Sequence, residues 1–156
     1  MTKMKVLASG VFDLIHYGHI RFLEEAKKLG GPDAKLVVIV ASDETVTRAK
    51  GRPPIIPEDQ RRAVVESLKV VDEAILGYKD QDLDKVMKTI KPDIVAVGHD
   101  QHDIEDEVNR LVAEKGYKTR VERVGRFGLE DLNSSSKIKR RIAEGSGRKP
   151  LPGHRR

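Results

Sequence analysis

Short apolar runs alternate along the chain with segments whose apolar residues recur at helical spacing. The runs predict strands at 5–9, 34–41, 73–76, 93–97 and 118–124. The helical pattern predicts helices at 18–29, after residue 42, and at 57–69, 83–90 and 104–115. Strands that alternate with helices favour a single α/β domain, a Rossmann-like doubly wound parallel sheet of about five strands with helices on both faces.

Local signals define several of these boundaries. Ser42 is placed to cap the helix after the second strand, and Pro57 opens the third helix after a proline-rich loop. Gly116 follows the helix at 104–115 in the position that favours a left-handed backbone. The run at 118–124 alternates, as expected of a strand nearer the edge of the sheet. Since such sheets bind ligands at the carboxyl ends of their strands, the residues that follow the strands are the candidates for function.

The segment between the first strand and the first helix, residues 10–19, reads GVFDLIHYGH. Gly10 allows backbone geometry that other residues avoid, and Gly18 lets a ligand approach the helix N-terminus, where free N–H groups attract phosphate. His16 and His19 can donate hydrogen bonds to an α-phosphate and stabilise charge as its bond to pyrophosphate breaks. In the alternative interpretation, the two histidines only satisfy polar groups around a tight turn.

A metal site at this segment is the weaker hypothesis. Asp13 and the two histidines could supply ligands, but no further His or carboxylate at ligand spacing completes the set nearby. We therefore predict no metal site formed by protein side chains alone.

The proline-rich loop carries cations that could meet an anionic ligand. Lys50 and Arg52 could reach a triphosphate or the phosphate of an acceptor, and Arg61, at the start of the next helix, could contact the acceptor or hold the loop. For each of them the alternative is an ordinary solvated surface charge.

Two further segments lie at predicted element ends. Asp100 follows the fourth strand and could contact a nucleoside, or it could simply cap the next helix. Ser134, Ser135 and Ser136 open the last helix, where hydroxyl and N–H groups could hold β- and γ-phosphates, although simple capping needs one serine only.

Residues 10–19 match the G-x-F-D-x-x-H-x-G-H signature of the cytidylyltransferase-like nucleotidyltransferases, and the chain resembles that family from Lys5 to Ala143. The resemblance implies transfer of a nucleoside monophosphate from a triphosphate carrying a divalent metal such as Mg²⁺, and a homodimer. It implies catalysis by His16, His19 and Lys50, and an acceptor phosphate held by Lys50, Arg52 and Arg61. The nucleotide-binding residues that it implies are Gly10, Val11, Phe12, His16, Tyr17, Gly18, His19, Asp100, Phe127, Ser134 and Ser135.

Within the family, the segments 53–62 and 98–102 are most similar to the archaeal FAD synthases, which use ATP and FMN. Those enzymes are often described with cysteines near the C-terminus, and this chain has none. Asn133 and Lys139 also depart from the family's usual apolar residue and arginine. One alternative is a CTP-dependent glycerol-3-phosphate cytidylyltransferase. Another is a nucleic-acid or partner-binding module on the same fold, which predicts a degraded active site.

Composition limits the remaining choices. A chain of 156 residues suits one domain, which we place at 1–144, followed by a flexible basic tail at 145–156. The net charge of +5 is concentrated from Lys137 onward, and this run motivates the nucleic-acid alternative. Because the histidines, Asp100 and the serines all remain, nucleic acid is not an expected partner. Zero cysteines exclude disulfides and a thiol nucleophile.

Because no apolar run approaches membrane-spanning length and no apolar signal region is present, we expect a cytoplasmic protein without a membrane partner.

Overall fold

The computed structural model describes residues 3–125 and 134–145, and its centre is a parallel sheet of five strands. The strands lie in the order β3-β2-β1-β4-β5. They are β1 (Lys5–Gly10), β2 (Lys35–Val40), β3 (Glu73–Leu76), β4 (Ile94–Val97) and β5 (Arg120–Arg123). The helices are α1 (Tyr17–Lys28), α2 (Asp43–Lys50), α3 (Glu58–Glu66), α4 (Leu83–Ile90), α5 (His102–Lys115) and α6 (Ser135–Ala143). This order confirms the doubly wound α/β fold.

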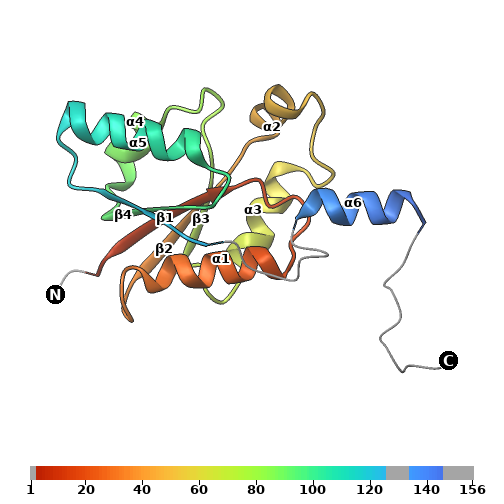
Figure 1. Cartoon of the computed structure of the whole chain (residues 1–156), viewed down its shortest axis with the longest axis horizontal. Helices are drawn as coiled ribbons and strands as arrows, with labels where there is room; N and C mark the ends of the chain where they lie inside the picture. The colour runs from red at the N-terminus through yellow and green to blue at the C-terminus, as the bar shows by residue number, and fades with distance from the viewer. Residues whose placement is uncertain (1–2, 126–133, 146–156) are drawn as a thin grey trace.

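Helices cover both faces of the sheet because its central strands are apolar on both sides. Val38 of β2 faces one layer, where it packs in a cluster with Leu23 of α1 and Val65 of α3. Its neighbour Val37 faces the other layer, in a cluster with Met87 of α4. Figure 1 shows α1 and α3 on one side of the sheet and α4 and α5 on the other.

Most predicted boundaries agree with the structure to within two residues. The Ser42 hydroxyl accepts a hydrogen bond from Thr45 N at 3.1 Å, and Gly116 ends α5 with a φ of 72°. The third helix is the exception, since it ends at Glu66 and was expected to reach residue 69. Beyond it, the Leu68 N–H bonds to a carbonyl only three residues back, so the chain continues in tight turns.

The connections of β1 and β4 create the crevice where a ligand can enter. The chain leaves β1 toward β2, whereas β4 is followed by α5 on the opposite face, so the two neighbouring strand ends diverge. Helix α6 projects beside this crevice and buries none of its residues (Figure 1). The proposed domain boundary at residue 144 stays a prediction, because residues 146–156 lie outside the described part of the chain.

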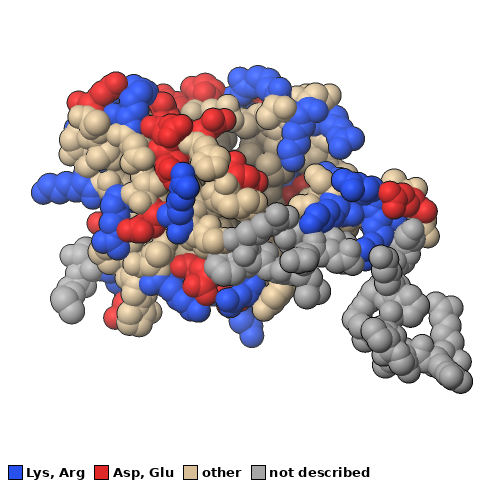
Figure 2. All heavy atoms as spheres, viewed as in Figure 1, with Lys and Arg blue, Asp and Glu red and all other residues tan. Residues whose placement is uncertain are grey.

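Charge is distributed unevenly over the face seen in Figure 2. Lys and Arg side chains gather over α2 and α6, on the right of the view, while both signs of charge are mixed over α4 and α5. Among the described residues, no helix combines the length and the apolar character needed to cross a membrane.

Candidate active site

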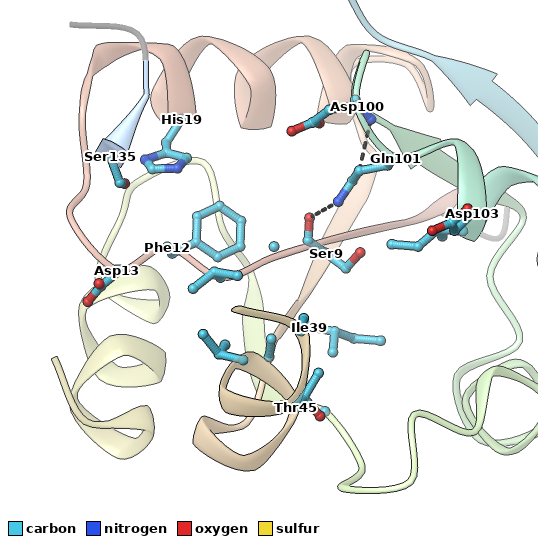
Figure 3. A pocket seen from close by; sticks show the side chains of 18 of the residues that line it. Ser9, Phe12, Asp13, His19, Ile39, Thr45, Asp100, Gln101, Asp103 and Ser135 are labelled. Carbon is cyan, nitrogen blue, oxygen red and sulfur yellow. Dashed lines mark hydrogen bonds between the residues drawn. The ribbon is translucent and has the colours of Figure 1, made fainter. Parts of the chain in front are cut away.

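A cavity of about 840 Å³ lies at the carboxyl ends of β1, β2 and β4, and it gathers most of the residues singled out from the sequence. Figure 3 shows it from close by, with Phe12 and His19 near its centre. The predicted residues that line it are Gly10, Val11, Phe12, His16, Gly18, His19, Lys50, Asp100, Ser134 and Ser135.

Gly10 and Phe12 together support His19. Phe12 is a non-glycine residue in the left-handed backbone region, with a φ of 54°, and only 3% of it is exposed. Its ring lies over Gly10 so closely that a Cβ there would stand 2.8 Å from two ring carbons. The ring centroid lies 5.2 Å from that of His19. A side chain at position 10 would therefore displace the ring against which His19 packs.

His16 and His19 cap the start of α1 reciprocally. The Nδ1 atom of His16 accepts from His19 N at 3.4 Å, and the Nδ1 atom of His19 accepts from His16 N at 3.2 Å. The two rings stack with centroids 3.8 Å apart. Because each Nδ1 accepts a hydrogen bond, each neutral ring carries its proton on Nε2. The histidines thus satisfy polar groups of the turn and also offer two N–H donors at the cavity.

Both histidines are neutral at physiological pH in the free protein. Burial lowers the pKa of His16, and burial together with the neighbouring charge of His16 lowers the pKa of His19 to about 4. As neutral Nε2–H donors they can contact a phosphoryl oxygen without first losing or gaining a proton.

Asp13, also in the signature, is fully engaged by other parts of the protein. It is 6% exposed and accepts hydrogen bonds from Ile55 N at 3.0 Å, Ile56 N at 2.9 Å and Lys139 Nζ at 2.6 Å. Burial alone would raise the pKa of this carboxyl, but these three donors hold it below its ordinary value. Within residues 3–125 and 134–145, no group of three His, Asp or Glu side chains could hold a metal ion.

The serines at the start of α6 divide the capping and lining roles. Ser134 is the N-cap, since its Oγ accepts from Lys137 N at 3.2 Å. Ser135 Oγ donates to Leu14 O at 3.0 Å, which ties α6 to the histidine loop. Both line the cavity together with Ser136, next to the first-turn N–H groups of α6. One serine therefore caps, and the group as a whole still faces the cavity.

The segment after β4 contains a residue whose role the sequence did not reveal. The N-cap of α5 is Gln101, without a side-chain capping bond, so Asp100 is not the helix cap and lies exposed at the cavity. The Gln101 amide joins two strand ends, because its Oε1 accepts from Gly98 N at 2.8 Å and its Nε2 donates to Ser9 O at 3.0 Å (Figure 3).

Arg61 occupies a different place from the one expected for an acceptor-binding residue. It is 1% exposed, and it donates to Ile56 O, Val11 O and Ala41 O at 2.8 Å each and to Asp43 at 2.6 Å. These contacts agree with the other role expected from the sequence, in which Arg61 holds the proline-rich loop. A buried guanidinium with four acceptors is not available to an incoming phosphate.

Three other predicted residues do not line the main cavity as described. Tyr17 is 59% exposed and lies outside it. Arg52 lines a second cavity of about 490 Å³, shared with Ser136 and Lys139 of α6. Phe127 lies outside the described residues.

One part of the main cavity is apolar and was not foreseen. It is formed by side chains from β2, α2 and α4, namely Ile39, Val46, Ala49, Leu83 and Val86. In the sequence these residues look like ordinary core positions, so their pattern gave no signal of a ligand site. Figure 3 shows Ile39 and Thr45 on one side of the strand that carries Ser9, and Asp100 on the other. Aliphatic side chains thus line the cavity on the side of α2 and α4, together with Thr45, Gln81 and Asp82, and we call this side its apolar part.

Known proteins resemble this chain over most of its length. The family model described as cytidylyltransferase-like matches residues 7–141. A protein from Methanopyrus kandleri named FAD synthase is 48% identical over 90% of this chain and 92% of its own length. Another of that name, from Ferroglobus placidus, is 51% identical over 88% of this chain and 87% of its own.

A solved structure shows that the resemblance extends to the fold. The crystal structure of a Thermoplasma volcanium protein, described as a lipopolysaccharide core biosynthesis protein, is 40% identical, with a TM-score of 0.67. The match covers 80% of this chain and 98% of that one. With the signature loop at the end of β1 and the family match over most of the sequence, this chain belongs to the cytidylyltransferase-like family.

Proposed function

We propose that this protein is an FAD synthase, which transfers AMP from ATP to FMN and releases pyrophosphate. The observation that carries the proposal is the two-part cavity, in which a polar part around His16 and His19 continues into an apolar part. Relatives named FAD synthase, about half identical over nearly the whole chain, support the same assignment.

The apolar part of the cavity favours a flavin over a small polar acceptor. An isoalloxazine ring needs a broad apolar slot, whereas glycerol phosphate needs a small polar one. Val46 and Ala49 of α2 and Leu83 and Val86 of α4 supply aliphatic walls, and Tyr78 adds a ring nearby. The cavity of about 840 Å³ lies within the usual range of roughly 300–1,000 Å³ for small-molecule sites.

The transfer is a single in-line displacement. An oxygen of the FMN phosphate attacks the α-phosphorus of ATP, and the bond from that phosphorus to the oxygen bridging to the β-phosphate breaks as pyrophosphate leaves. His16 and His19 donate Nε2–H to the α-phosphoryl oxygens, where negative charge accumulates in the transition state. The reaction needs no covalent enzyme intermediate.

The remaining predicted residues take roles that follow from their places around the cavity. Asp100, exposed beside the start of α5, meets the nucleoside, while Ser134 and Ser135 meet the β- and γ-phosphates. Lys50 is the last residue of α2, at the border of the apolar part, and directs the acceptor phosphate. A divalent metal such as Mg²⁺ enters on the triphosphate, whose oxygens are the ligands that it prefers.

Filling the apolar part tests the proposal. Ala49 is an exposed residue of α2 that lines the cavity, so Ala49→Trp adds bulk there without overpacking the core. We expect the KM for FMN to rise about tenfold or more, with the Kd of a non-hydrolysable ATP analogue within about twofold of the wild type. Thr47→Trp, on the same helix but outside the lining, is the matched control. An unchanged KM for FMN in Ala49→Trp would place the flavin elsewhere.

A further inference from the structure

Asp13 connects three segments that are far apart in the sequence. It belongs to the histidine loop, and it accepts two hydrogen bonds from the backbone of the proline-rich loop, at Ile55 and Ile56. Its third partner is Lys139 of α6, at 2.6 Å. The side chain of Asp13 is 3% exposed and that of Lys139 25%, so this ion pair is largely shielded from water.

The two segments that Asp13 holds carry groups that are expected from the sequence to bind phosphate. The proline-rich loop contains Arg52, and the N-terminus of α6 presents Ser134, Ser135 and Ser136 to the main cavity. The loop and the helix face one another across the second cavity, which Arg52, Ser136 and Lys139 line together. Ser136 lines both cavities, so they adjoin at the start of α6.

Polar contacts help to hold helix α6 in place, since none of its residues is fully buried. Two of these contacts reach consecutive residues of the histidine loop, from Ser135 Oγ to Leu14 O and from Lys139 Nζ to Asp13. Since no residue of α6 is fully buried, directional and charged contacts contribute to fixing its position against the described part of the chain.

We propose that Asp13 is a positioning residue, which docks α6 and the proline-rich loop against the histidine loop and thereby assembles the triphosphate-binding groove. The inference rests on the proposed function, since it assigns the groove to the triphosphate of that reaction. Asp13 borders the main cavity, but the proposal gives it no contact with substrate. Its three donors already engage it, and its depressed pKa keeps it ionised for Lys139 at neutral pH.

The test measures nucleotide binding in the absence of an acceptor. The Kd of α,β-methylene-ATP with Mg²⁺ is determined by calorimetry for the wild type, Lys139→Met, Lys139→Arg, Asp13→Asn and the Asp13→Asn/Lys139→Met double variant. Since a charge-assisted hydrogen bond is lost, we expect Lys139→Met to weaken binding about tenfold and Lys139→Arg to stay within about twofold. The double variant should bind the nucleotide no more weakly than Asp13→Asn, because both substitutions break the same ion pair between Asp13 and Lys139.

Two results would overturn the inference. If Lys139 contacted phosphate directly and Asp13 merely neutralised it, Asp13→Asn would tighten binding. If the two single effects multiplied in the double variant, the residues would act separately. Lys88→Met, which removes an exposed lysine paired with Asp84 on α4, is the matched control and should leave the Kd unchanged.

Folding and acceptor identity are followed separately. The Lys139 variants change a partly exposed side chain and leave both backbone bonds to Asp13 in place, so an unchanged Kd in Lys139→Met would overturn the inference even if Asp13→Asn does not fold. FAD formation by the wild type is assayed in a separate reaction. If the wild type binds the ATP analogue but makes no FAD, FMN is not the acceptor. The comparison of Kd values among the Asp13 and Lys139 variants would still test the role of Asp13.

Discussion

His16 and His19 hold each other in place through backbone N–H groups that each donate to the partner's Nδ1, at 3.4 and 3.2 Å. In the proposed reaction, helix capping and catalysis thus use opposite nitrogens of the same rings. The capping bonds select the neutral form with a proton on Nε2, which is the donor that a phosphoryl oxygen requires. A replacement at either position therefore changes both the start of α1 and the donor at the cavity.

Replacement of His19 should affect catalysis more than nucleotide binding. We expect His19→Ala to lower kcat by about 100- to 1000-fold, because a donor aimed at transition-state charge is lost, with a much smaller rise in the Kd of an ATP analogue. His102→Ala, at an exposed histidine outside the cavity lining, should keep kcat within about twofold. A His19→Ala enzyme with near-normal kcat and stability would leave only the polar-turn role for the histidines.

Stability should decrease with falling pH across the range in which His19 titrates in the unfolded chain. The pKa of His19 is about 4 in the folded protein against an ordinary value of 6.5, so between these values the unfolded state binds more protons. The free energy of unfolding should therefore be lower at pH 5.5 than at pH 7.5, by about 1 kcal/mol from this group. In His19→Asn, urea unfolding at the two pH values should show a smaller difference, and an unchanged difference would exclude His19 as its source.

Arg61 should matter for stability and not for acceptor recognition. We expect Arg61→Gln to lower the free energy of unfolding by about 3–5 kcal/mol, because carbonyl oxygens and Asp43 lose a buried charged donor. Its neighbour Arg62, in a half-exposed pair with Glu66, gives the control, since Arg62→Gln should cost less than about 1 kcal/mol. If the Arg61→Gln protein were as stable as the wild type and had a raised KM for FMN, Arg61 would have to bind the acceptor directly.

Gln101 should be required to keep the ends of β1 and β4 together. Gln101→Glu preserves the shape of the side chain, but a carboxylate cannot donate to Ser9 O. A carboxylate oxygen would then face this carbonyl oxygen where the Gln101 amide now donates a hydrogen bond of 3.0 Å. We expect a loss of about 1–3 kcal/mol in stability and a KM for ATP raised several-fold. The same change at the exposed Gln60 of α3 should leave both quantities as in the wild type.

The fold could be predicted from the sequence because its signals are local and agree with one another. Runs of β-branched residues identified the buried strands, and Ser42 and Gly116 identified helix ends by their capping chemistry. The 57–69 helix was overextended because nothing in its periodicity reveals the turns that begin at Ser67.

The candidate site could be recognised from the sequence only where chemistry is concentrated in a short segment. The histidine loop has unusual residues at fixed spacing, so the sequence shows it directly. Arg61 and Asp13 are different, since an arginine looks the same whether it meets a ligand or four acceptors of the protein itself, and only the tertiary contacts decide. The apolar walls at Val46 and Val86 were missed for the same reason, because a lining residue and a core residue have the same side chain.

The most direct measurement offers the purified protein, with Mg²⁺, each of ATP and CTP in combination with each of FMN and glycerol 3-phosphate. Pyrophosphate release and the nucleotide product are followed in all four reactions, which share one chemistry and differ in the fit of base and acceptor. The two-part cavity predicts rapid formation of FAD from ATP and FMN, well above the other three pairs. Rapid formation of CDP-glycerol, with no FAD from either nucleotide, would contradict it.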